Sequence, residues 1–193
     1  MFIYVEIHYG HGINTLWHGL LVFSLMQAWF PSLGELWNSP TWFLSASLFA
    51  NILFPHIISP ISKLNRKGLL TFLFTTLGIS LCIKVLYSIT CGWTMMEGVQ
   101  TPKPAFYFNL VRFNPLVNFL EFLLGIASAR FLMTSKSKGK SYPELILLAL
   151  LAIVALRVII PINDMIVRTA LFLPLFMLFL QHLHKSEGIL TKV

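Results

Sequence analysis

The sequence predicts an all-α integral membrane protein, a polytopic transmembrane helix bundle with about six spanning helices. Of the 193 residues, 56% are hydrophobic and 11% are charged, whereas soluble domains average roughly 45–50% and about 25%. The mean hydropathy is +0.78. Six stretches approach the roughly 20 apolar residues that a spanning helix needs, and basic residues are concentrated in alternate connections between them. We therefore expect residues 1–193 to form a single membrane domain.

The prolines agree with the positions of the expected spans. Pro31 ends the first span, while Pro115 and Pro143 occupy first-turn positions, where proline removes no needed donor. Pro55 and Pro174 lie inside spans, where we expect kinks whose freed carbonyls are satisfied by neighbouring groups. The spans are expected near residues 12–30, 41–58, 69–90, 115–133, 143–160 and 165–183.

The distribution of lysine and arginine predicts the orientation. The loops 59–68 and 134–142 and the tail after residue 183 hold eight of the 14 basic residues. The connections that alternate with them hold only Lys103 and Arg112. Because cytoplasmic loops carry the excess of Lys and Arg, we expect both basic loops and the C-terminus to be cytoplasmic.

Several other classes of protein are excluded or disfavoured. The net charge of +7 is spread between apolar runs, so no single basic face indicates nucleic-acid binding. Two cysteines are too few for a disulfide scaffold, and one continuous helix holds Cys82 and Cys91 about 13 Å apart, too far for a bridge. His8 and His11 are three residues apart but have no carboxylate or cysteine at ligand spacing, so we expect no metal site.

Charged residues inside the expected spans gather in the outer half of the membrane. Lys84 and Glu121 each lie about 9 Å from the outer end of their span, and Arg157 and Arg168 lie closer to that surface. Charges at such depths pair, line a cavity or reach the headgroups. Two interpretations remain open. In the first, Lys84 and Glu121 form an ion pair while the arginines reach the headgroups. In the second, these residues line a polar cavity that is open to the outside and binds an anionic or sugar-like substrate.

Two groups of motifs resemble a known family. The first comprises Gln27-Ala-Trp-Phe-Pro31, then Trp37-Asn-Ser-Pro-Thr-Trp-Phe-Leu-Ser45 and Phe54-Pro55. The second comprises Phe113-Asn-Pro-Leu116 followed by Glu121-Phe-Leu-Leu-Gly125. In order and spacing they resemble the acyltransferase 3 family of integral membrane O-acyltransferases. One departure from the family's pattern is Ser47, which stands where the family usually has glutamate.

The resemblance implies a function. It implies transfer of an acyl group, expected to be acetyl from acyl-CoA on the cytoplasmic side, to a hydroxyl of an extracytoplasmic glycan or lipid at the bacterial inner membrane. The matching motifs cover the middle of the family's domain. We therefore expect this chain to be a fragment or degenerate copy, inactive alone, whose histidine-bearing first span and last spans are missing or come from another chain. The alternative is a transporter component or a non-enzymatic membrane protein.

The residues themselves allow both structural and functional roles. Asn38 and Asn114 are placed to cap the helices that follow them, and Trp42 is expected at the membrane interface, where an indole anchors in headgroups or stacks on a sugar. No residue is assigned as catalytic, since the expected histidine is absent. The candidate substrate-cavity residues are Asn38, Trp42, Ser45, Ser47, Lys84, Arg112, Glu121 and Arg157.

Overall fold

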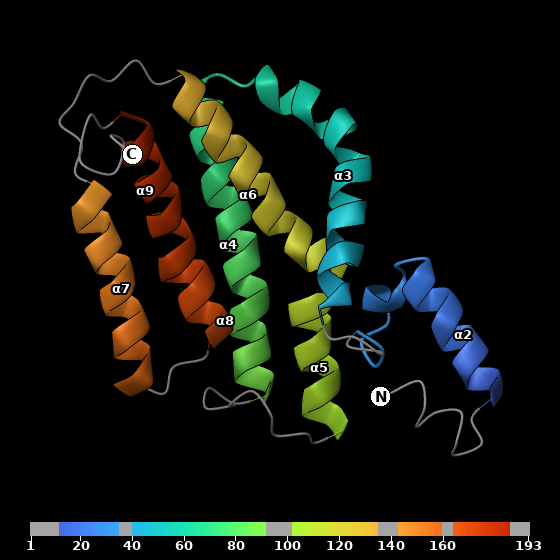
Figure 1. The fold of residues 1–193 in the computed structure, drawn as a ribbon. Coiled ribbons are helices and arrows are strands. Elements are labelled where there is room, and N and C mark those ends of the chain that lie inside the picture. Colours follow the sequence, from blue (N-terminus) through green and yellow to red (C-terminus); the bar gives the residue numbers. More distant parts are fainter. Residues whose placement is uncertain (1–11, 35–39, 92–101, 135–142, 160–163, 186–193) are drawn as a thin grey trace. The chain divides into compact units, whose positions relative to one another are not determined.

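The computed structural model describes residues 12–34, 40–91, 102–134, 143–159 and 164–185 (Figure 1). Every regular element in these ranges is a helix, which confirms the all-α prediction. The longer helices are α2 (Gly12–Phe23), α3 (Thr41–Ser62), α4 (Arg66–Cys91), α5 (Pro102–Phe113), α6 (Pro115–Thr134), α7 (Pro143–Ile159) and α9 (Leu173–Lys185). The shorter elements are the 3₁₀ helix η1 (Gln27–Trp29), the single turn α8 (Asp164–Val167) and the π-helix η2 (Arg168–Phe172).

Three helical runs in the described part of the chain are long and apolar enough to cross a membrane. They are Thr41–Ser62, Arg66–Thr90 and Phe106–Thr134, the last of which includes both α6 and the end of α5. Two further apolar helices, Glu144–Ala155 and Met165–Leu180, are shorter. These findings agree with a helical bundle of membrane type. The count of six spans stays a prediction.

The helix expected over residues 12–30 ends early, at Phe23. Leu25 has a φ of 57°, which is the left-handed region. The amide of Met26 donates to the Leu21 carbonyl at 2.8 Å and that of Leu25 to the Val22 carbonyl at 3.1 Å. This pair of bonds is the Schellman arrangement that closes helix C-termini. The chain then turns into η1 rather than continuing as one helix, so α2 has 12 residues.

Asparagine side chains begin two of the long helices. Asn65 Oδ1 accepts a hydrogen bond of 2.8 Å from the amide of Gly68 at the start of α4. Asn114 Oδ1 accepts one of 2.9 Å from the amide of Leu116 at the start of α6. The second bond confirms the predicted cap at Asn114, because the side-chain oxygen satisfies an amide that has no partner within the helix.

The segment expected to link the third and fourth spans contains an additional helix, α5, which ends just before Asn114. Asn118 Nδ2 donates to the carbonyls of Arg112 at 2.9 Å and Asn114 at 3.0 Å. One side-chain amide in the first turns of α6 therefore binds a carbonyl near the end of α5 and the carbonyl of the residue between the two helices. The segment from Pro102 to Thr134 thus forms two helices joined by this bridge, whereas the sequence pattern predicted a loop followed by one span.

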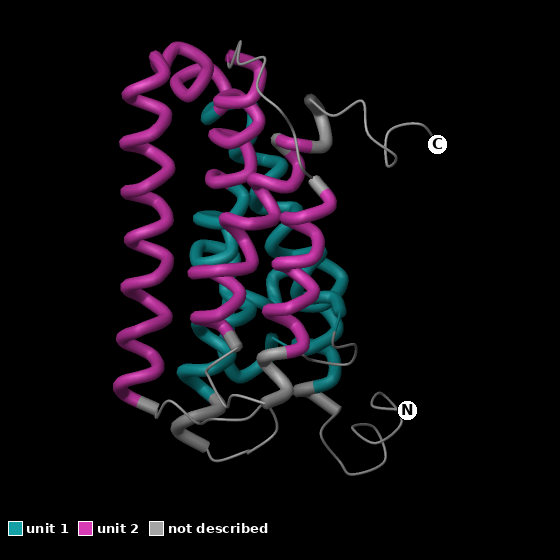
Figure 2. Tube along the Cα trace, turned by 90° about the vertical axis from the view of Figure 1, so that its left-hand side faces the viewer, with its two compact units in different colours: residues 1–57, 99–122 teal, residues 58–98, 123–193 magenta. Residues whose placement is uncertain are grey.

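The chain divides into two compact units, coloured separately in Figure 2. The first comprises Met1–Ile57 with Val99–Phe122, and the second Ile58–Gly98 with Leu123–Val193. Aromatic rings hold the first unit together. Trp29 contacts Phe49 with ring centroids 5.0 Å apart, Phe49 contacts Phe119 at 5.3 Å, and Phe54 contacts Phe122 at 6.2 Å. These contacts connect η1 to α3 and α3 to α6.

The second unit is held by helix pairing and a few polar contacts. Within it α7 packs on α9, and α4 packs on α8 and η2. Arg130 Nη2 of α6 donates to the carbonyl of Ser62, the last residue of α3, at 2.9 Å. A cation at a helix C-terminus is favourable, and the contact joins α6 to the end of α3.

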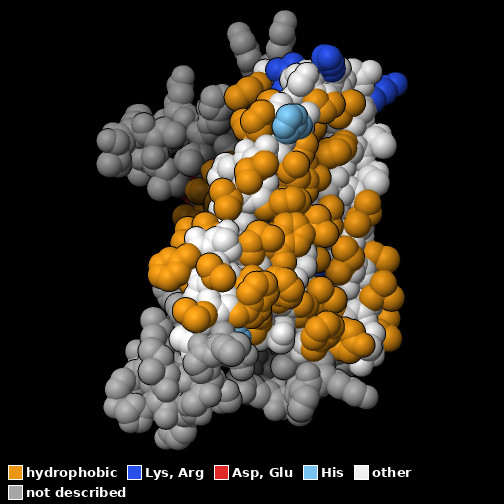
Figure 3. Space-filling model, turned by 90° about the vertical axis from the view of Figure 1, so that its right-hand side faces the viewer, with side chains coloured by type: hydrophobic (Ala, Val, Ile, Leu, Met, Phe, Trp, Pro, Cys, Tyr) orange, Lys and Arg blue, Asp and Glu red, His pale blue; other side chains and the backbone are white. Residues whose placement is uncertain are grey.

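On the face drawn in Figure 3, hydrophobic side chains cover most of the described surface.

Candidate functional site

A buried lysine lies at the centre of the second unit. Lys84 of α4 is 2% exposed, and its Nζ donates a hydrogen bond to Oγ1 of Thr169, which is 0% exposed. The bond joins two segments 85 residues apart in the sequence. A charged group within a helix of spanning length is costly and marks a functional site by default. Among the predicted site residues that the structure describes, Lys84 is thus the one that is both buried and hydrogen-bonded to a distant segment.

Lys84 belongs to a buried polar stripe on α4. The stripe consists of Thr76, Ser80, Lys84 and Ser88, which follow one another at intervals of four residues and are 5%, 0%, 2% and 0% exposed. Residues four apart share a helix face, and the stripe extends for about 18 Å along the axis at 1.5 Å per residue. One face of a spanning helix therefore presents hydroxyls and an ammonium to the interior.

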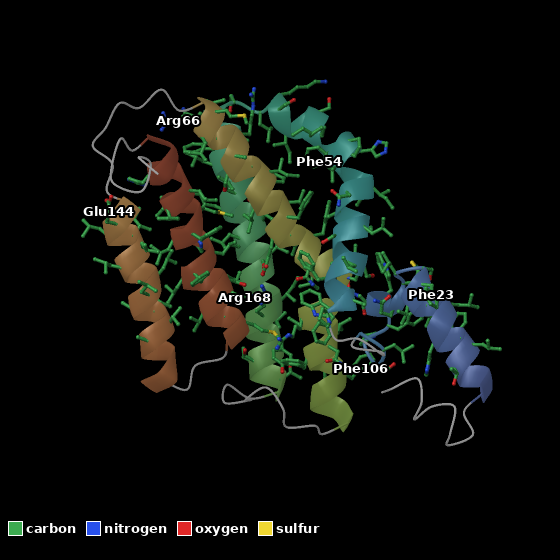
Figure 4. The ribbon with its side chains drawn as sticks, in the orientation of Figure 1. Phe23, Phe54, Arg66, Phe106, Glu144 and Arg168 are labelled. Carbon is green, nitrogen blue, oxygen red and sulfur yellow. The ribbon has the colours of Figure 1, made fainter. Side chains whose placement is uncertain are left out.

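The partner of Lys84 lies in a π-helical turn. The turn begins at Arg168, labelled in Figure 4, and the amide of Leu173 donates to the Arg168 carbonyl. Pro174 follows directly and has no amide hydrogen, so it cannot continue the α-helical ladder. The expected distortion at Pro174 thus takes the form of a widened turn, a feature often found at functional sites.

The first unit gathers aromatic and cationic groups around the start of α3. Trp42 contacts Phe113 with ring centroids 5.2 Å apart. The guanidinium carbon of Arg112 lies 5.2 Å from the Phe108 ring centroid and 5.5 Å from that of Phe113. Cations are attracted to ring faces at such distances. Trp42 and Arg112, two predicted site residues, therefore converge on the same buried phenylalanine.

Two polar side chains near this cluster are buried without hydrogen-bond partners among the described residues. Gln27 is 0% exposed and neither Nε2 nor Oε1 is bonded, and Ser45 is 1% exposed with an unbonded Oγ. The contact of Trp29 with Phe49 sets η1 against α3, one turn beyond Ser45. Buried hydrogen-bonding groups are rarely left unpaired, so this region is a second candidate for ligand or water binding.

The remaining predicted residues are placed less fully. Glu121 is partly exposed on α6, one turn beyond Asn118, and Ser47 is partly exposed on α3. Arg157 lies on α7, but its side chain, like the whole of Asn38, falls outside the described residues. The two interpretations of Glu121, an ion pair with Lys84 or a place in an outward-facing cavity, both stay predictions.

Sequence reasoning missed Ser80 and Thr169 as members of the candidate site. The four-residue spacing of Ser80 from Lys84 was a usable signal. Thr169 gave no signal, because its pairing with Lys84 depends on how α4 meets η2. Gln27 was noted as part of a motif, but its complete burial comes only from the packing of η1.

Comparison with known proteins identifies the family to which the chain belongs. No curated protein and no solved structure gives a significant match. The profile of one family, described as an acyltransferase domain, matches residues 1–189. This range includes the first unit, the second unit up to residue 189 and every candidate residue named above. The match covers almost the whole chain, and the described helices are apolar, so the chain belongs to the acyltransferase 3 family of membrane acyltransferases.

Proposed function

We propose that this chain takes part in moving an acyl group, acetyl in the simplest case, from acyl-CoA on the cytoplasmic side to a hydroxyl of a glycan or lipid on the outer side of the bacterial inner membrane. The observation that carries the proposal is the family match over residues 1–189. The buried polar groups of both units support it, because a chain that only anchors in lipid has no need of them.

The reaction is an acyl transfer. The acceptor hydroxyl oxygen attacks the thioester carbonyl carbon, a carbon–oxygen bond forms and the carbon–sulfur bond breaks. The hydroxyl proton passes to a base, and the coenzyme A thiolate leaves and is protonated. General base catalysis of this kind contributes about 10²–10⁴-fold. We expect the base to be the histidine of the family's first span, provided in addition to residues 1–193, so that these 193 residues alone are inactive.

The proposed sides of the membrane follow from charge. The basic loops 59–68 and 134–142 and the C-terminus face the cytoplasm and the donor. Trp42, Ser45 and Arg112 then lie toward the outer surface and the acceptor. Trp42 suits a sugar ring, since an indole presents a large apolar face, and Arg112 suits an anionic acceptor.

Inverted membrane vesicles provide the test, because their cytoplasmic face is outward. Vesicles containing the chain, the chain with a co-expressed histidine-bearing family span, or neither receive acetyl-coenzyme A labelled with ¹⁴C in the acetyl group. We expect label in vesicle glycan or lipid only when both chains are present, and release of that label as acetate by mild alkali, as an ester requires. A histidine-to-alanine partner is the matched control and should give no label.

Absence of chain-dependent ester label in every arm would overturn the proposed function. Accumulation of labelled acetate or labelled acetyl-coenzyme A inside the vesicles, without ester formation, would favour a transporter component instead. Label formed by the chain alone would retain the acyltransferase and remove the need for a partner.

A further inference from the structure

We propose that Ser80 and Lys84 form the site that stabilises negative charge on the acyl carbonyl oxygen during transfer. The inference rests on the proposed function and assigns to this chain a catalytic element that the match to the family does not locate. It is built from one face of α4 and from η2, all within the second unit.

The first step is the placement of the two donors. Ser80 and Lys84 are four residues apart on α4 and are 0% and 2% exposed. Side chains at this spacing have Cβ atoms about 5–6 Å apart on one helix face, so a hydroxyl and a flexible ammonium can reach one oxygen atom from two directions. Thr169 accepts one N–H of Lys84, which fixes the end of a long side chain that otherwise has many rotamers.

The second step is the state of the Ser80 hydroxyl. Helical Ser and Thr side chains commonly bond back to their own helix. Ser88 does so, donating to the Lys84 carbonyl at 3.0 Å, and Thr90 donates to the Leu86 carbonyl at 2.8 Å. Ser80 Oγ is fully buried and has no partner among the described residues. Ser80 therefore offers a hydroxyl donor one turn from the Lys84 ammonium. An alanine at this position would fill the space without burying a polar group.

The third step is the chemistry. When the acceptor oxygen adds to the thioester carbon, the carbonyl π electrons move to oxygen and a tetrahedral alkoxide forms. Loss of the thiolate then restores the carbonyl. Preorganised donors in a site without water stabilise such an oxyanion strongly, and removing one lowers kcat by about 10²–10³-fold. The Lys84 ammonium bonded to Thr169, and the buried Ser80 hydroxyl one turn away, supply two donors of this kind.

The experiment uses the binding of a donor analogue that cannot react. The probe is acetonyl-coenzyme A labelled with ¹³C at its carbonyl, a ketone in which a methylene separates sulfur from carbonyl. Isotope-edited infrared spectra of the purified chain with the probe report the polarisation of that carbonyl. We expect a band at lower wavenumber than in buffer, and a shift back to higher wavenumber in Ser80→Ala and Lys84→Met.

Ser88→Ala is the matched control, because it removes a buried hydroxyl of the same stripe that is already bonded to its own helix. It should leave the band unchanged. Lys84→Arg keeps the charge and should retain part of the shift. Thermal unfolding of each variant identifies those that fold. In the two-chain vesicle assay, Ser80→Ala should lower kcat about 10²-fold with little change in KM.

The outcomes separate this inference from the proposed function. Bound probe with the same carbonyl band in wild type, Ser80→Ala and Lys84→Met would overturn the oxyanion site and leave acyl transfer intact. Failure of wild-type chain to bind the probe at all would count against acyl-CoA as the donor. A band shift lost in Ser80→Ala but kept in Ser88→Ala would support the assignment.

Discussion

At the scale of single residues, the backbone at Gly34 lies close against a buried ring of the first unit. A Cβ atom added there would lie 2.8 Å from Cδ2 and 3.2 Å from Cβ of Phe113. Phe113 is 1% exposed and also contacts Trp42. The absence of a side chain at Gly34 therefore lets the chain after η1 pack on the ring that two predicted site residues share.

We predict that Gly34→Ala destabilises the protein by about 1–3 kcal/mol, because a buried phenylalanine has to shift to admit the methyl group. Thermal unfolding in detergent measures the change. Gly78→Ala is the control. It lies on α4 with no atom within 4 Å of the added Cβ, and it should stabilise the helix by about 1 kcal/mol. Equal stability of the two variants would contradict the close approach.

The sequence could identify residues that carry charge or capping chemistry but could not identify their partners. Asn114 was predicted as a cap because a cap depends on local sequence, and the bond to Leu116 confirms it. Lys84 was singled out because a lysine in an apolar run is conspicuous. Its bond to Thr169 depends on packing between segments 85 residues apart, and no local pattern encodes that.

At the scale of elements, the cap at Asn114 determines where α6 begins. We predict that Asn114→Ala costs about 1 kcal/mol, since the Leu116 amide loses its acceptor. Asn114→Asp keeps an oxygen in the same position and should retain most of the stability. Urea or thermal unfolding of the two variants in detergent distinguishes them. Loss of stability in the aspartate variant equal to that in the alanine variant would exclude the cap as the cause.

The hydrogen bond from Lys84 to the Thr169 hydroxyl joins α4 to η2. We predict that Thr169→Val, which preserves shape but removes the acceptor of the Lys84 hydrogen bond, destabilises the protein by about 1–3 kcal/mol. Thr169→Ser retains the hydroxyl and should behave nearly as wild type. Denaturation midpoints in detergent give the difference. If valine and serine at this position are equally stable, the hydrogen bond does not hold the two segments together.

Helix ends could be predicted where proline or asparagine marks them. The prediction was wrong where the end depends only on the backbone conformation. The end of α2 at Phe23 rests on Leu25 in a left-handed conformation, which leucine rarely adopts, so the apolar run gave no reason to stop there. The helix α5 was missed because its segment carries Asn109 and Arg112 among aromatics, a composition that also suits an interfacial loop.

At the scale of the whole molecule, the charge distribution predicts which segments share a side of the membrane. After replacement of Cys82 and Cys91 by serine, single cysteines at Glu35 and Lys103 should react with a membrane-impermeant maleimide added outside intact cells. Single cysteines at Lys63, Lys138 and Lys185 should react only after the membrane is opened. Reaction from outside at position 138 but not at position 103 would reverse the predicted orientation.

The length of α6 has a consequence for the membrane in which this protein works. Its 20 residues span about 30 Å, the thickness of a typical hydrocarbon core. The whole apolar run of 29 residues from Phe106 to Thr134 measures about 43 Å and would need an extreme tilt to fit. With α6 spanning the hydrocarbon, the break at Asn114 falls near its edge, and the exposed Phe106 and Tyr107 of α5 are left for the headgroup layer. A bilayer a few ångströms thicker would draw the capped start of α6, with its polar asparagines, into hydrocarbon, at a cost of fractions of a kcal/mol per ångström of mismatch.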